Sequence, residues 1–143
     1  MTPVYKVYDA FLAKMLDDEW TGWTFEDIKK DWRALLDGAI PYFKFPRHSL
    51  EINCEEFFVN DLTNEEIQIL ASFMKVEWLN RTILTWEHVK PMYTEKDFSE
   101  ANLIDKLHSL LDGEIKKARR LESIYYRSIN NKPFDYTTLA GID

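Results

Sequence analysis

The sequence predicts an all-α, mainly helical fold with a small β element, built as an antiparallel helix bundle around one long C-terminal helix. Three observations lead to this prediction. Residues 99–129 carry an uninterrupted helical pattern of apolar residues. Shorter helical patterns precede it in the first 41 residues and after Thr63. Only residues 50–55 alternate with the period of a half-buried strand, so little of the chain is expected to be sheet.

The long helix is expected from Ser99 to about Ile129. Ser99 fits the N-cap, because its hydroxyl can accept from the backbone N–H of Asn102. Gly113 weakens the middle of the helix and predicts a bend or a close crossing by another helix. The apolar face repeats every three or four positions and comprises Leu103, Leu107, Leu110, Leu111, Ile115, Ala118, Leu121, Ile124 and Tyr125.

Basic residues gather in the second half of this helix. They are Lys116, Lys117, Arg119, Arg120 and Arg127. Positive charge near a helix C-terminus interacts favourably with the helix dipole, so a solvated face explains them without a partner. Contact with acidic groups of a neighbouring subunit and contact with DNA phosphates are the two functional alternatives.

Two helices are expected in the N-terminal part. The first should begin with Thr2 as its cap and Pro3 at its first helical position. The second should begin at the cap Thr24 and stop at Pro41. A short turn with Trp20 and Trp23 joins them, so an antiparallel hairpin is predicted.

The small β element is expected after an aromatic and basic loop, residues 42–49. Leu50, Ile52 and Cys54 alternate with polar residues, and residues 57–59 extend the pattern. Three partners for this strand stay open: a poorly marked strand, a neighbour's sheet, or a hairpin within residues 42–59. In such a strand Cys54 is expected to be a buried, inert thiol.

The remaining segments complete a single domain, residues 1–143. Its parts are an N-terminal part (1–59), a helical core (60–129) and an extended C-terminal tail (130–143). Thr63 and Glu66 form a capping box for a helix that should end near Thr85. The tail is loose unless its spaced apolar residues dock on another protein; these are Phe134, Tyr136, Leu139 and Ile142.

Composition narrows the class of partner. The net charge of −7 argues against a generic binder of nucleic acid or of anionic membranes. Aromatic residues make up 15% of the chain, more than a small core usually absorbs, so we expect some to contact other proteins. A single cysteine excludes an internal disulfide. No secretory signal or membrane span is recognised, which predicts a soluble protein made in a cytoplasm.

The search for chemistry finds no catalytic residue, no cofactor-binding loop and no metal-ligand spacing, so the chain is not expected to be an enzyme. Its four glycines do not form a phosphate-binding loop. His48, His88 and His108 lack the spacing of metal ligands. An enzyme remains the alternative only if His48, His88 and Cys54 converge in one cleft.

Two segments carry a resemblance to a known family. Residues 61–81 (DLTNEEIQILASFMKVEWLNR) and 93–111 (YTEKDFSEANLIDKLHSLL), with Asp-Phe-Ser ahead of the long helix and a tail after it, are similar to the head–tail connector proteins of tailed bacteriophages, also called adaptor or neck proteins. The resemblance covers about half of the chain. The aromatic-rich residues 1–59 depart from the simplest adaptors.

The resemblance implies a structural virion protein, made in the host cytoplasm and located in the neck. It would form a ring, commonly of twelve subunits, that extends the DNA channel without binding DNA specifically. The tail residues Phe134, Tyr136, Leu139 and Ile142 would contact the portal or a neighbouring subunit, and a tail protein or second neck ring would bind the other side. The alternative function is a small cytoplasmic helical adaptor or regulator with one protein partner.

Overall fold

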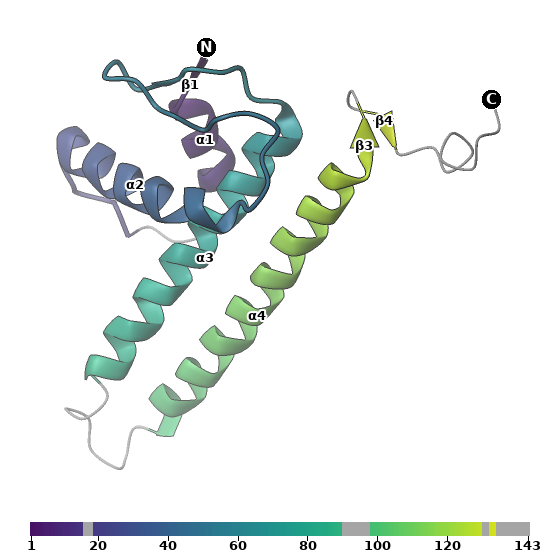
Figure 1. Ribbon diagram of the computed structural model, residues 1–143. Helices are drawn as coiled ribbons and strands as arrows, with labels where there is room; N and C mark the ends of the chain where they lie inside the picture. Colours follow the sequence, from purple (N-terminus) through teal and green to yellow (C-terminus); the bar gives the residue numbers. More distant parts are fainter. Residues whose placement is uncertain (16–18, 90–97, 130–131, 134–143) are drawn as a thin grey trace.

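The computed structural model describes residues 1–15, 19–89, 98–129 and 132–133. These residues form four α-helices: α1 (Tyr5–Ala13), α2 (Phe25–Ala39), α3 (Asn64–Val89) and α4 (Phe98–Tyr126). A 3₁₀ turn, η1 (Ile40–Tyr42), follows α2. The predicted fold class is confirmed, because the chain is mainly helical with two very small antiparallel sheets (Figure 1).

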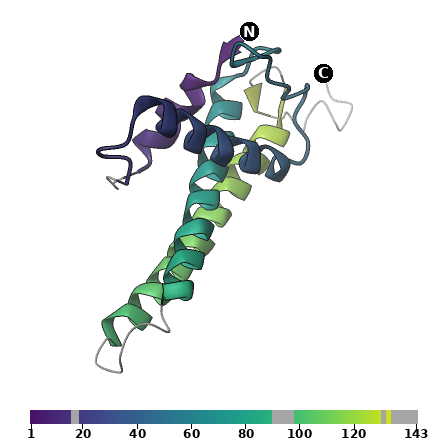
Figure 2. The same ribbon diagram turned by 90° about the vertical axis from the view of Figure 1, so that its left-hand side faces the viewer.

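Helix α3, and not the long C-terminal helix around which the bundle was predicted, lies at the centre of the fold. Helices α1 and α2 pack on one side of α3, and α4 runs antiparallel along another side (Figure 1 and Figure 2). Because α3 is covered on two sides, apolar residues occupy several of its faces; Ile69, Leu70, Phe73, Met74 and Val76 are all buried. Helix α4, the longest of the four described helices, packs mainly against α3 and is far less covered.

The first helix begins later than predicted. Thr2 and Pro3 form strand β1 (Thr2–Pro3), which pairs antiparallel with β2 (Phe57–Phe58). The Thr2 hydroxyl accepts from the backbone N–H of Leu62 at 2.9 Å and does not cap a helix. The prediction of a cap at Thr2 and a helical Pro3 was therefore wrong. The backbone of both residues pairs with β2, and the Thr2 side chain bonds Leu62, so neither residue is available to start a helix.

The predicted strand at residues 50–55 is also wrong in detail. Ile52 makes a single bridge to Phe58, and the chain then turns back at once. Asn53 Oδ1 accepts from the backbone N–H groups of Glu55 at 2.9 Å and Phe57 at 3.0 Å, which closes the turn. Cys54 lies in this turn and is exposed, so its expected burial is contradicted. Two of the three open partners are present: Ile52 pairs with Phe58 in a short hairpin within residues 42–59, and β2 also pairs with the poorly marked strand β1.

The starts of α2 and α3 follow the local cap signals, whereas the end of α3 lies beyond its predicted position. Thr24 caps α2 by accepting from the Asp27 N–H at 3.2 Å. The capping box of α3 is confirmed: Thr63 and Glu66 bond each other's backbone N–H at 3.3 and 2.9 Å. Helix α3 continues past Thr85 to Val89.

The long helix is slightly displaced from its prediction. Helix α4 begins at Phe98, so Ser99 is not its N-cap. It ends at Tyr126 because strand β3 (Ser128–Ile129) pairs with β4 (Lys132–Pro133). A Cβ added at Gly113 would meet no described heavy atom within 4 Å, apart from its own helix and chain neighbours, so the predicted close crossing is absent there.

Candidate functional site

The five basic residues predicted on α4 separate in the structure. Lys117 and Arg120 line a hollow on the side of α1 and α3. Arg119 turns toward the loop after α2, and Lys116 and Arg127 are exposed to solvent. The predicted group is therefore not one continuous contact surface.

Arg119 is occupied within the chain. Its Nη1 donates to Glu122 Oε1 at 2.5 Å and to the Tyr42 carbonyl at 3.2 Å. Its guanidinium also lies 5.2 Å from the centroid of the Phe73 ring. These contacts join α4 to α3 and η1, so Arg119 serves the fold rather than a partner.

Lys117 and Arg120 belong to a feature that we call the basic groove. Its polar lining comes from the end of α1 and from α3 and α4: Lys14, Ser72, Lys75, Glu114, Lys117 and Arg120. Leu121 and Ile124 complete a hollow of about 570 Å³. A second hollow of about 410 Å³ shares Lys14, Lys75 and Glu114, which makes the groove continuous along α3 and α4.

The groove has an excess of positive charge. Glu114 is only 8% exposed, and its Oε1 lies 3.0 Å from Lys75 Nζ and 3.7 Å from Lys117 Nζ. Burial lowers the pKa of Lys14, with Lys75 and Lys117 acting in the same direction and Glu114 opposing them. The described lining residues thus comprise four cationic side chains and one carboxylate, an excess of three positive charges.

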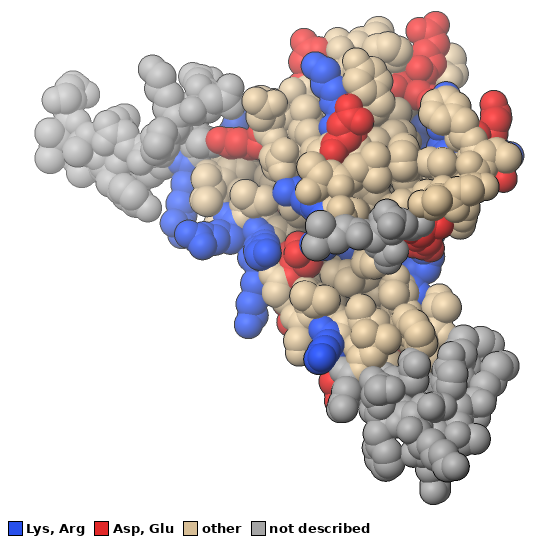
Figure 3. Space-filling view, turned by 180° about the vertical axis from the view of Figure 1, so that it is seen from behind, with Lys and Arg blue, Asp and Glu red and all other residues tan. Residues whose placement is uncertain are grey.

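Apolar groups border these charges. Ile124 is 49% exposed, and Leu110, in the second hollow, is 57% exposed although both belong to the predicted apolar face of α4. Figure 3 shows lysine and arginine side chains gathered on one side of the molecule, next to tan surface. The groove therefore suits a partner that offers carboxylates together with apolar groups.

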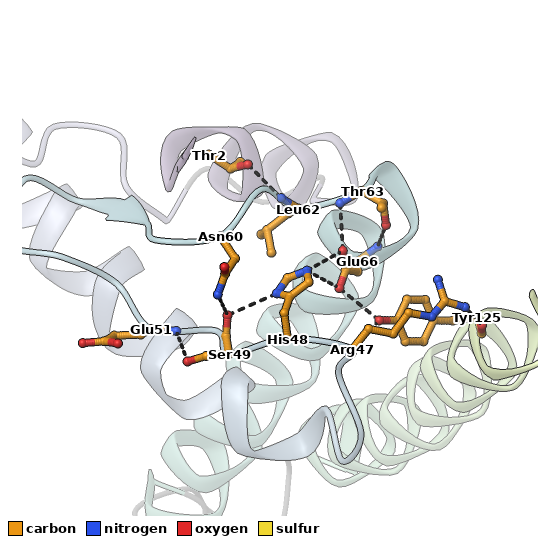
Figure 4. A network of polar contacts seen from close by, with 10 residues as sticks. All are labelled: Thr2, Arg47, His48, Ser49, Glu51, Asn60, Leu62, Thr63, Glu66 and Tyr125. Atoms are coloured by element: carbon orange, nitrogen blue, oxygen red, sulfur yellow. Dashed lines mark hydrogen bonds and ion pairs between the residues drawn. The ribbon is translucent and has the colours of Figure 1, made fainter. Parts of the chain in front are cut away.

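A second polar cluster surrounds Glu66 (Figure 4). Its buried carboxylate lies 2.9 Å from His48 Nε2 and accepts from the Tyr125 hydroxyl at 3.0 Å, besides its bond in the capping box. Arg47 lies over the Tyr125 ring, 4.1 Å from the centroid, and its Nη2 donates to the Tyr125 carbonyl at 2.6 Å. Burial and Glu66 raise the pKa of Tyr125 to about 12. This cluster ties the loop after η1 to α3 and α4, a structural role.

A third cluster joins α2 to α3 through tryptophan and arginine. Trp20 Nε1 donates to Asp31 at 2.7 Å, and Arg81 contacts the same carboxylate at 2.5 and 3.1 Å. Trp78 Nε1 donates to Glu19. Trp23 lies beside this cluster and is 43% exposed. Aromatic surface is therefore exposed here, as the composition predicts.

The residues considered for catalysis do not form a site where the structure describes them. No group of three or more His, Cys, Asp or Glu side chains in the described residues could hold a metal ion. His48 contacts Glu66, His108 lies 3.1 Å from Glu87, and Cys54 is in the exposed turn. The His88 side chain and the tail residues Phe134, Tyr136, Leu139 and Ile142 lie outside the described residues.

Comparison with protein-family models, curated proteins and solved structures finds no match for this chain. No helix among the described residues is both long enough and apolar enough to traverse a bilayer. Lys14, Lys75 and Glu114 complete the groove and were not predicted from the sequence. The only local signal was the spacing of Glu114 and Lys117, three residues apart on one helix.

Proposed function

We propose that this chain is a structural protein of a bacteriophage virion, which assembles as a ring in the neck, joins the capsid portal to the tail and extends the DNA channel. The observation that carries the proposal is the incomplete covering of α4. This helix packs mainly on α3 and leaves Leu110, Ile124 and Tyr126 at the surface. We expect another subunit to cover this side of α4, because extended exposed apolar surface marks protein–protein contacts.

Charge supports the same proposal. The chain has a net charge of −7, yet the basic groove concentrates four cations around one carboxylate. An acidic protein with one basic hollow has two unlike surfaces, which a head-to-tail ring requires of each subunit. The acidic balance also disfavours tight binding of DNA, which suits a channel through which DNA must pass.

Assembly of the purified chain tests the proposal. Light scattering after size-exclusion chromatography should give the mass of several copies, and micrographs should show rings. Adding the portal protein of the same phage should move the chain into the portal fraction, and antibody label on phage particles should lie at the head–tail junction. A chain that stays monomeric with and without portal would contradict the proposal.

Residues 134–143 are the proposed portal contact. A chain that ends at Pro133 should still assemble but should no longer move with the portal. The matched control changes Thr137 and Thr138 to Ala within the full chain, which leaves Phe134, Tyr136, Leu139 and Ile142 in place. Undiminished portal binding by the shortened chain would assign that contact elsewhere.

The second candidate is a small helical adaptor or regulator with one protein partner. Exposed aromatic residues away from α4 favour it: Tyr5, Trp23 and Phe25. Such a protein would remain monomeric or dimeric at the concentrations at which a connector forms rings. The mass measurement therefore separates the two candidates.

A further inference from the structure

The basic groove has a counterpart of opposite charge elsewhere on the same chain. Residues 51–56, which we call the acidic turn, carry Glu51, Glu55 and Glu56 next to the β1–β2 pair. Glu51 and Glu55 are exposed, whereas Glu56 is half-buried and lines a hollow of mixed charge with side chains of α2. Glu51 and Glu55 are therefore the two carboxylates most available to another molecule.

The acidic turn is held in one conformation by its backbone. Asn53 N–H donates to the Phe57 carbonyl at 2.8 Å, and Val59 N–H donates to the Glu51 carbonyl at 2.9 Å. Glu56 has a φ of 63°, in the left-handed region that costs a residue with a side chain about 1 kcal/mol. A rigid turn loses little conformational entropy on binding, so it is suited to present charges to a partner.

One chain's turn lies away from its own groove. The Glu56 carbonyl accepts from the N–H of Val4, ahead of the start of α1, whereas Lys14 directly follows the end of α1. The ten steps along the chain from Val4 to Lys14 correspond to about 15 Å along a helix. Contact between turn and groove therefore calls for two copies.

We propose that the basic groove binds the acidic turn of a second copy of this chain. Glu51 and Glu55 of one copy would approach the surplus cations of the other, Lys14, Lys117 and Arg120, while Lys75 stays with Glu114. Val59 is 43% exposed, and its N–H is bonded to Glu51, so an apolar group accompanies the carboxylates toward Leu121 and Ile124. The inference rests on the self-assembly in the proposed function and names the surfaces that make the contact.

Such a contact joins two different surfaces, so each copy keeps a free turn at one end and a free groove at the other. Repetition of the contact produces a closed ring or an open filament, depending on the rotation between copies. A nucleic-acid occupant fits less well, because its phosphates would leave the apolar side of the groove without a partner and the whole chain would repel it.

Charge reversal tests the pairing. The groove variant is Lys117→Glu with Arg120→Glu, and the turn variant is Glu51→Lys with Glu55→Lys. The matched control is Lys116→Glu with Arg127→Glu, which makes the same change of charge on two exposed residues, one in α4 and one directly after it. Circular dichroism checks that each variant folds, and sedimentation velocity at low salt measures assembly over a range of concentrations.

The groove and turn variants alone should each weaken self-association about tenfold or more, while the control stays close to wild type. Mixing the two variants in equal amounts should restore assembly, because each reversed surface then meets an opposite charge. No rescue in the mixture, or an equal loss in the control, would overturn the inference. Groove-dependent binding of a short DNA duplex, or assembly lost only on removing residues 134–143, would also overturn it.

The test separates failure of this inference from failure of the proposed function. If wild type assembles and neither reversal changes its association, the pairing is wrong and the ring remains. If wild type is monomeric at every concentration, both are wrong.

Discussion

Two buried tyrosine hydroxyls show that the contribution of a polar atom to folding stability depends on its hydrogen-bond partners. Tyr125 donates to Glu66 at 3.0 Å and accepts from the Arg47 N–H at 2.9 Å. The Tyr8 hydroxyl is equally enclosed and has no hydrogen-bond partner among the described residues. A buried hydroxyl without a partner loses its bonds to water and gains nothing in return.

Replacing each tyrosine by phenylalanine should therefore have opposite effects. Tyr125→Phe removes two hydrogen bonds and leaves Glu66 one donor short, so the free energy of unfolding should fall by about 1–3 kcal/mol. Tyr8→Phe should leave stability unchanged or raise it by up to about 1 kcal/mol. Urea unfolding followed by circular dichroism measures both. Equal losses in the two variants would mean that Tyr8 has a partner after all.

The same hydroxyls predict the alkaline limit of stability. Burial is the main reason that the pKa values of Tyr8 and Tyr125 both rise to about 12. Above pH 10 the unfolded chain releases protons that the folded chain keeps, so stability falls as pH rises from about 10 to about 12. Each group should account for up to about 2 kcal/mol of that fall.

Absorbance at 295 nm records tyrosine ionisation, and circular dichroism in the same samples records unfolding. In wild type the last tyrosines to ionise should do so together with unfolding. A Tyr8→Phe, Tyr125→Phe double variant should lose less stability between pH 10 and 12 than wild type. A loss of equal steepness would show that other groups set the alkaline limit.

At the scale of elements, the sequence predicts what is decided by neighbours in the chain. Thr24 and Thr63 cap helices as expected, because a cap needs only backbone N–H groups two or three residues ahead. Thr2 has the same chemistry but bonds Leu62, sixty residues away. The α-helices were predictable, whereas the short strands β1, β3 and β4 and the boundary that distant contacts set at Thr2 were not.

Two helical glycines test whether helix propensity or packing dominates. Gly113→Ala in α4 should raise the free energy of unfolding by about 0.5–1 kcal/mol, because nothing described lies within 4 Å of the added methyl group. Gly38→Ala in α2 would place its Cβ 2.7 Å from Glu77 Oε2, and Glu77 hydrogen-bonds the Tyr42 hydroxyl. For Gly38→Ala the free energy of unfolding should therefore rise less than for Gly113→Ala, or should fall. Thermal unfolding of both variants measures which of the two is more stable.

At the scale of the whole molecule, the groove illustrates why a site can escape prediction. Lys117 and Arg120 stand out in the sequence as part of a basic run. Lys14 and Lys75 lie more than 35 residues earlier, and only the packing of α1, α3 and α4 brings them to Glu114. The same packing removes Arg119 from the group by giving it partners in the chain. The run of charge on one helix therefore predicted two of the four cations of the basic groove.

Salt separates the two forces that can hold copies of this chain together. The Debye length falls from about 10 Å at 0.1 M salt to about 3 Å at 1 M, so contacts between exposed charges weaken steeply over this range. Apolar contacts through Leu110 and Tyr126 are not screened and are strengthened by salts such as sulfate.

If the groove supplies most of the contact, sedimentation velocity should show assemblies at 0.1 M sodium chloride and smaller species at 1 M. The groove variant, already weak, should show little further dependence on salt, whereas the Lys116→Glu, Arg127→Glu control should follow wild type. Assembly that persists at 1 M would assign the contact to the open apolar face of α4. Leu110→Lys should then be the change that disperses the copies.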